Sequence, residues 1–252
     1  ILATVVSVPD AQSAAAVDAI NAWHGRPALP LGMVKHVGVV RPSPYAAGLA
    51  TGCPNRVRSA ADVPDAVATY REVLERQPDG SVTVVTVGYL TNLADLLDRL
   101  PEGGRLSGTE LVRRKVGRWV CMGGNFVGDP PKDDLRLGNV NFQKDAASAV
   151  RAIDGWPTPV VFVGREIGSV PSGLEAGACL SGTPPDNPVR RAYELYFGGT
   201  AKNRHVADPT TVDALKGAVK GLFMGKDPKS PWFNFRLPAE SPFAFWNGMI
   251  IS

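Results

Sequence analysis

The stretch from Ser81 to Leu100 reads SVTVVTVGYLTNLADLLDRL and decides the fold class. Residues 82–87 are a short run of valine and threonine, too short for a helix and too apolar for an exposed strand. Such a run is typical of a parallel strand that is covered on both faces. Gly88 ends the run, and leucines then recur at helical spacing, with Thr91 placed to cap the helix. Strand, tight turn and helix together are the building block of an open α/β domain.

The turn from Val87 to Asn92 is where a ligand site is expected. Ligands of open α/β folds bind outside the carboxyl ends of the strands, and this turn follows such an end. On the local pattern alone, a connecting loop without function is the simpler interpretation.

Strands and helices alternate along the rest of the chain. Strands are expected within 1–8, 29–40, 118–122 and 159–163, and helices at 11–23, 63–77, 107–116, 144–154, 187–197 and 209–219, the last one capped by Asp208. This alternation predicts a mainly parallel open sheet flanked by helices. With no internal repeat or linker, residues 1–252 are expected to form one α/β domain. The tail from Leu222, rich in proline and aromatic residues, is expected to pack on the core as a lid or edge.

The composition and net charge of the chain indicate which kinds of binding partner are to be expected. The chain has 252 residues, of which 44% are hydrophobic and 20% charged, as in an ordinary globular protein. Its net charge is +3 and its longest basic block is Arg113–Lys115, so no nucleic-acid partner is expected. No apolar segment approaches membrane-spanning length and no signal peptide is visible, so no membrane partner is expected. The three cysteines are far apart and argue against a disulfide framework, and localisation, cytoplasmic or exported, stays open.

Carboxylate and amide side chains gather where the expected strands end. They are Asp10, Asn92, Asn125, Asn139, Asn141, Glu166 and Asp208. Donors and acceptors of this kind suit a polyhydroxylated ligand such as a sugar, and their oxygens also suit Ca²⁺ or Mg²⁺. Taken singly, each residue could equally cap a helix or close a turn. The histidines show no paired metal spacing, and the chain contains no GxSxG or P-loop motif.

Five short segments carry a family resemblance in their order and spacing. They are GYLTNLA (88–94), VCMGG (120–124), NVN with the aspartate and alanines that follow it (139–147), PVVFVG (159–164) and ADPTTV (207–212). These segments resemble, in turn, the "GPLTNLA" turn, the "VVMGG" strand, the "EFN…DPEAA" segment, the next strand and the "HDPxAV" helix start of the inosine/uridine-preferring nucleoside hydrolases. The similarity extends over nearly the whole chain, with a bacterial branch of that family as the nearest pattern.

The resemblance implies a Ca²⁺-dependent N-ribohydrolase that cleaves the N-glycosidic bond of ribonucleosides with a metal-bound water. It implies that Asp208 is a metal ligand and that Val87 offers its backbone carbonyl to the metal. Asn141 matches an asparagine that binds ribose, and these three residues are expected to converge in one cleft at the strand ends. The partner would be a nucleoside or another ribose-containing small molecule. The family commonly forms dimers and tetramers, so assembly into a homo-oligomer is compatible with the resemblance.

Several positions depart from the family pattern. Asn139 stands where the family has glutamate, and Asp10 stands near a ribose-binding asparagine. Ala207 replaces a histidine that protonates the leaving base in many members, although His205 is close in sequence. Asn125 and Glu166 complete the set of expected substrate-binding residues with Asp10, Asn139 and Asn141.

The largest departure concerns the aspartate cluster "DTDxGxDDA" of the family, which would precede Ile1. No DxDxxxDD occurs in this chain, so the resemblance predicts that a strand and a helix with two metal ligands and the general base are missing from it. The strand within Leu2–Val8 should then be covered by a partner chain, by the aromatic tail or by an absent segment. An alternative is a catalytically impaired nucleoside- or sugar-binding protein of the same fold, and a third is a structural remnant that acts in assembly.

Overall fold

A computed structural model of the chain describes residues 1–36, 38–125, 139–167 and 174–214. The described strands are β1 (Thr4–Val6), β2 (Leu31–Met33), β3 (Val82–Thr86), β4 (Val116–Met122), β5 (Val160–Val163), β6 (Glu175–Ala176) and β7 (Arg204–His205). The helices are α1 (Ala11–Trp23), α2 (Ala46–Gly52), α3 (Ala66–Glu75), α4 (Thr91–Leu97), α5 (Gly108–Lys115), α6 (Val140–Gln143), α7 (Ala146–Gly155), α8 (Pro188–Phe197) and α9 (Ala207–Ala214). Single 3-10 turns occur at η1 (Ala60–Asp62), η3 (Arg165–Ile167) and η4 (Ala178–Gly182).

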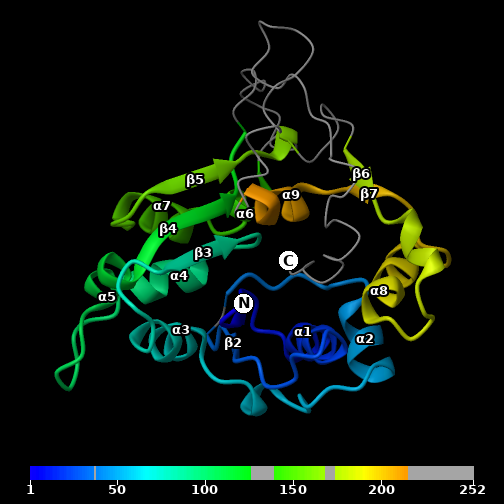
Figure 1. Cartoon of the computed structure of the whole chain (residues 1–252), viewed down its shortest axis with the longest axis horizontal. Helices are drawn as coiled ribbons and strands as arrows, with labels where there is room; N and C mark the ends of the chain where they lie inside the picture. The colour runs from blue at the N-terminus through cyan, green and yellow to red at the C-terminus, as the bar shows by residue number, and fades with distance from the viewer. Residues whose placement is uncertain (37, 126–138, 168–173, 215–252) are drawn as a thin grey trace, which may run out of the picture.

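Parallel strands flanked by helices form the domain, which confirms the expected α/β class. The strands β3, β4 and β5 make one three-stranded sheet in that order, and β1 and β2 make a second parallel sheet. The short β6 and β7 pair antiparallel. Within the described residues β1 pairs only with β2 and β3 only with β4, so the expected single open sheet is divided in two. Figure 1 shows these two parts, with α4, α5 and α7 beside the larger sheet and α1 and α3 beside the smaller one.

The core of the larger sheet forms around β4. Trp119 is fully buried and packs against Trp156, with 4.9 Å between the ring centroids, and against Phe162. Its indole N–H donates to Thr86 Oγ1 at 2.8 Å, which satisfies the one polar atom that this side chain would otherwise bury unpaired. The leucines of α4 join the same cluster. The helical spacing of these leucines is therefore explained by one buried face.

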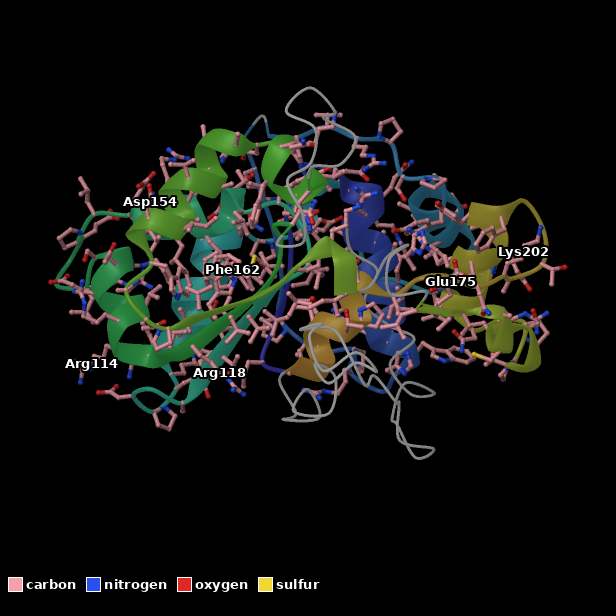
Figure 2. The ribbon with its side chains drawn as sticks, turned by 90° about the horizontal axis from the view of Figure 1, so that it is seen from above. Arg114, Arg118, Asp154, Phe162, Glu175 and Lys202 are labelled. Atoms are coloured by element: carbon pink, nitrogen blue, oxygen red, sulfur yellow. The ribbon has the colours of Figure 1, made fainter. Side chains whose placement is uncertain are left out.

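A second core holds the other half of the domain together. The helices α1, α2 and α8 pack with the 3-10 turn η4 through Ile20, Leu49, Leu180 and Ala192. Figure 1 shows α1, α2 and α8 side by side, at a distance from β5 and α7. Charged side chains lie toward both ends of the molecule, with Arg114 toward one end and Lys202 toward the other (Figure 2).

Two expected helix caps are wrong. The helix α4 begins at Thr91 and is preceded by Leu90. The hydroxyl of Thr91 instead donates to the carboxylate of Asp145, which itself caps α7, so a tertiary contact takes the place of the local one. The helix α9 begins at Ala207, so Asp208 lies in its first turn rather than at its cap.

Other expectations fall on parts of the chain outside the described residues. They are the continuation of the last helix to Val219 and the aromatic tail from Leu222. Among the described helices, none has both the length and the apolar character that crossing a membrane requires.

Candidate functional site

Asn141 lies where β3 and β4 end. Its Nδ2 donates to the carbonyl of Val87 at 3.3 Å and to the carbonyl of Met122 at 3.1 Å. The backbone N–H of Asn141 in turn donates to Asn139 Oδ1 at 3.0 Å, and this bond caps α6. The structure therefore brings together three residues that the sequence placed in one site, Val87, Asn139 and Asn141.

A glycine fixes the position of α6 on the strand end. A Cβ atom at Gly123 would lie 2.1 Å from Cζ of Phe142, so no larger residue can stand there while this ring keeps its place. Phe142 also packs edge-on against Phe162 of β5, with 6.3 Å between the ring centroids. The aromatic contact presses α6 onto the sheet, which holds the neighbouring Asn141 against the Val87 carbonyl.

Asp208 approaches the same edge from α9. This helix contacts β4, β5 and η3, the turn that follows β5. Burial raises the pKa of Asp208 to about 7, and the positive charge of Arg204 acts in the opposite direction. The helix of Asp208 thus reaches the turn after β5, but the described residues show no hydrogen bond between Asp208 and Asn141, so the expected convergence of these two side chains stays a prediction.

The remaining candidate residues have different surroundings. The carboxylate of Asp10 accepts hydrogen bonds from the backbone N–H groups of Gln12 and Ser13 and caps α1. Asn125 is half-buried just beyond the end of β4. Glu166 lies in η3, immediately after β5. Asp10 therefore has an evident structural role, and Asn125 and Glu166 follow the strand ends as the sequence indicated.

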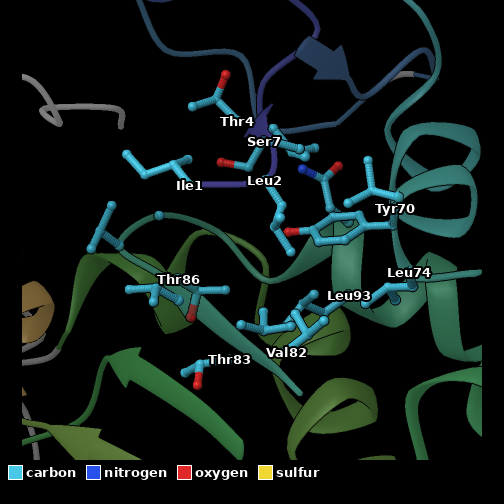
Figure 3. Close-up of a pocket in the computed structure, with 18 of the residues that line it drawn as sticks. Ile1, Leu2, Thr4, Ser7, Tyr70, Leu74, Val82, Thr83, Thr86 and Leu93 are labelled. Carbon is cyan, nitrogen blue, oxygen red and sulfur yellow. The ribbon is translucent and has the colours of Figure 1, made fainter. Parts of the chain in front are cut away.

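A cavity of about 460 Å³ adjoins this edge. Its walls come from the segment 1–7, from β3, and from α3 and α4 (Figure 3), and it reaches Val87, Tyr89 and Asn92 at the carboxyl end of β3. Asn92 Nδ2 donates to the carbonyl of Val6 at 3.1 Å. Asn92 Oδ1 and Tyr89 Oη are buried, and neither has a hydrogen-bond partner among the described residues. Tyr89 was not predicted as a candidate site residue, because its only local signal in the sequence is its position in the GYLTNLA turn.

The described residues do not by themselves fit a Ca²⁺ ion. Ca²⁺ takes about six to eight oxygen ligands. Of the two positions that the resemblance assigned to the metal, Asp208 offers one carboxylate, and the Val87 carbonyl already accepts a hydrogen bond from Asn141. No group of three or more His, Cys, Asp or Glu side chains that could hold a metal occurs in the described part of the chain. A Ca²⁺ site would need oxygen ligands from elsewhere.

Comparison with known proteins bears on the fold. No protein-family model matches the sequence, and no curated protein matches it. Among solved structures, the type III effector protein XopQ in complex with adenosine diphosphate ribose matches with a TM-score of 0.61. The match covers 88% of this chain and 74% of that chain, at 16% sequence identity. At this identity the likeness shows the fold alone, which is an α/β domain with parallel strands flanked by helices, as expected from the sequence. The inosine/uridine-preferring type stays a prediction.

Proposed function

We propose that this chain binds a ribose-containing ligand, such as a nucleoside, at the carboxyl ends of β3 and β4. The observation that carries the proposal is the position of Asn141, whose amide meets the Val87 carbonyl where the two strands end. The two N–H groups of this amide are held by the carbonyls of Val87 and Met122, which leaves Oδ1 of Asn141 as an acceptor for the hydroxyl groups of a ribose. That XopQ was solved with adenosine diphosphate ribose, a ribose-containing molecule, on the same fold supports this choice.

Binding is a better supported function than hydrolysis. Asn139 and Ala207 stand where the resembling family has a glutamate and a histidine, and neither an amide nor a methyl group transfers protons at neutral pH. The carboxylate of Asp10, another candidate, is engaged in capping α1. The described residues therefore offer more groups that hold a sugar than groups that activate water.

Calorimetric titration with ribose, inosine, uridine and adenosine diphosphate ribose tests the proposal. We expect at least one of these ligands to bind, and Asn141→Ala to weaken its binding about tenfold, because one or two hydrogen bonds are lost. The control is Arg114→Ala on α5, where Arg114 pairs with Asp79 at 2.9 Å, and it should bind as the parent does. Circular dichroism verifies that both variants are folded. Absence of binding to all four ligands, or unchanged binding by Asn141→Ala, would refute the proposal.

Hydrolysis of the N-glycosidic bond is the second candidate, favoured by the position of Asp208 on α9 at the same edge. It would require Ca²⁺ ligands and a general base beyond the described residues. We expect the 252-residue chain to release base from inosine or uridine no faster than its Asp208→Ala variant. The measurement is base release with added Ca²⁺ and with a chelator. Turnover that both the chelator and Asp208→Ala abolish would make hydrolysis the function, whereas turnover insensitive to the chelator would contradict the metal assignment.

A further inference from the structure

Two segments of the proposed ribose site are joined to each other at two points. Asn141 Nδ2 donates to the carbonyl of Val87 at 3.3 Å, and further along both segments the hydroxyl of Thr91 donates to Asp145 Oδ2 at 2.5 Å. Both bonds join residues that are 54 positions apart, so the two segments follow the same order. Two points of attachment fix the direction of one segment relative to the other as well as its distance, which a single bond cannot do.

The bond between Thr91 and Asp145 is of a strong kind. A hydroxyl that donates to an ionised carboxylate makes a charge-assisted bond, with an oxygen–oxygen distance of about 2.5–2.7 Å. Burial by itself would raise the pKa of Asp145, but hydrogen bonds from Thr91 and Ser148 and the positive charge of Arg151 lower this pKa below its usual value of 3.8. The carboxylate is therefore ionised at neutral pH and stays an acceptor. Thr91 is only 2% exposed, so water cannot readily take the place of Asp145.

The helices α4 and α7 do not depend on this bond for their packing. They already share one hydrophobic cluster through Leu93 and Leu96 of α4 and Ala149 and Ala152 of α7. The bond lies at their first turns, where α4 follows the end of β3 and α7 follows α6. It therefore sets how the two helix starts lie relative to each other, while the apolar contacts hold the helices together.

The orientation of the Asn141 amide follows from the same arrangement. The carbonyls of Val87 and Met122 can only accept hydrogen bonds, so the nitrogen of the amide must face them and Oδ1 must face away. Contact of Phe142 with Gly123 fixes α6 on the end of β4, but it does not fix the turn after β3. At 3.3 Å the bond to Val87 is at the long limit for an N–H donor, which is about 3.2 Å, so a small displacement of this turn would break it.

We propose that Thr91 and Asp145 are positioning residues of the ribose site. Their bond, the Thr91–Asp145 clasp, keeps the Val87 carbonyl against Asn141 and so keeps Oδ1 of Asn141 turned to the ligand. Neither of the two side chains needs to touch the ligand. The inference rests on the proposed ribose binding for its consequence, but the placement of Asn141 by the clasp can be measured without a ligand. A purely structural role would lower stability and leave the Asn141 amide in place.

Nitrogen-15 NMR of the Asn141 side-chain amide tests the clasp in the free chain. The Asn141→Ala variant identifies the signal by its disappearance. Thr91→Val removes the hydroxyl with little change of shape, and we expect the amide protons of Asn141 to exchange with water at least about tenfold faster, because the bond to Val87 is lost. Thr91→Ser restores a hydroxyl and should keep the signal and the exchange rate of the parent. Asp145→Ala removes the acceptor and should act as Thr91→Val does.

Two variants of α3 are matched controls. Thr69 is 4% exposed and its hydroxyl donates to the carbonyl of Asp65 at 2.9 Å, so Thr69→Val also removes the bond of a buried hydroxyl. The carboxylate of Asp65 caps α3 as that of Asp145 caps α7, so Asp65→Ala also removes a helix cap. Both controls should lose stability to a similar extent in urea unfolding but leave the Asn141 signal unchanged. Circular dichroism verifies that all variants are folded, and if Thr91→Val does not fold, Asp145→Ala decides.

Calorimetric titration then measures the consequence for binding. With the nucleoside or adenosine diphosphate ribose that the parent binds, Thr91→Val should weaken binding at least about fivefold, whereas Thr91→Ser and Thr69→Val should stay within about twofold of the parent. An unchanged Asn141 signal in Thr91→Val, or an equal change in Thr69→Val, would overturn the inference. So would a displaced amide with undiminished affinity. A parent chain that binds none of the ligands would refute the ribose site alone, because the amide signal tests the clasp by itself.

Discussion

At the scale of single residues, amides rather than carboxylates organise the edge where the strands end. Asn141 joins the ends of β3 and β4 through the carbonyls of Val87 and Met122, and Asn139 holds Asn141 by capping α6. Amides make these bonds without a charge, so their role does not change with pH. Asp208 is different, because its carboxyl group titrates near neutrality.

The pKa of Asp208 predicts how stability varies with pH. Burial raises this pKa from 3.8 to about 7, so the folded chain holds the proton more tightly than the unfolded chain. The free energy of unfolding should therefore fall as pH rises between these values, and the loss is complete above the folded pKa. Asp208→Asn removes the titrating group. We expect the variant to match the parent near pH 4 and to be more stable at pH 8 by roughly 1–2 kcal/mol, since solvent reaches part of this side chain.

Urea denaturation of the parent and of Asp208→Asn between pH 4 and pH 8 measures this difference. Asp65→Asn is the control, because Asp65 caps α3 with its side chain and asparagine caps equally well. A gain by Asp208→Asn at acid pH, or equal stability at every pH, would contradict the assigned direction of the shift.

At the scale of elements, α4 and α5 approach so closely that one position excludes a side chain. A Cβ atom at Gly108 would lie 1.5 Å from the backbone carbonyl oxygen of Leu96, and backbone cannot rotate away as a side chain can. We expect Gly108→Ala to lower the free energy of unfolding by about 2–3 kcal/mol through overpacking. Gly182→Ala is the matched control, since nothing lies within 4 Å of its added Cβ, and it should change stability by less than about 0.5 kcal/mol.

Urea unfolding of the two glycine variants provides the measurement. Equal stability of Gly108→Ala and Gly182→Ala would show that α4 and α5 can separate at little cost, contrary to this packing.

Helices could be predicted from the sequence where the residues that begin or end them are close together in the chain. Ser107 and Glu110 form the capping box that begins α5, and both are visible in the sequence. The start of α4 was misjudged because the Thr91 hydroxyl bonds to Asp145, which is 54 residues away. The four-residue α6 was missed, because the helix was expected only from 144 and α6 depends on the contact of Phe142 with Gly123 rather than on a periodic pattern.

At the scale of the whole molecule, the alternation of strands and helices in the sequence was sufficient to predict the α/β fold class. It was not sufficient to predict which strands pair with each other. Which edges pair depends on contacts between distant segments, and no local pattern predicts that β1 and β3 are not paired with each other in the described part of the chain. Ligand sites of open α/β folds lie at the carboxyl ends of the strands, and this rule predicted that Asn141 and Val87 lie close together. The hydrogen bond between them agrees with that prediction. The same rule could not separate a helix cap such as Asp10 from a binding group, because both require a carboxylate after a strand.

The division into two sheets also predicts unequal local stability. The strand β4 has partners on both sides and carries the fully buried Trp119, whereas β1 and β2 have three residues each and one shared ladder. Because amides open most readily where few contacts hold them, we expect the amides of β4 to exchange at least about tenfold more slowly than those of β1 and β2. Hydrogen exchange followed by mass spectrometry resolves the three segments.

The helix α3 provides an internal reference for that experiment. It packs against β2 as well as against α4 and α5, so its protection should lie between those of the two sheets. Equal protection of β1 and β4 would show that the two sheets open as one cooperative unit and that their separation has no energetic consequence.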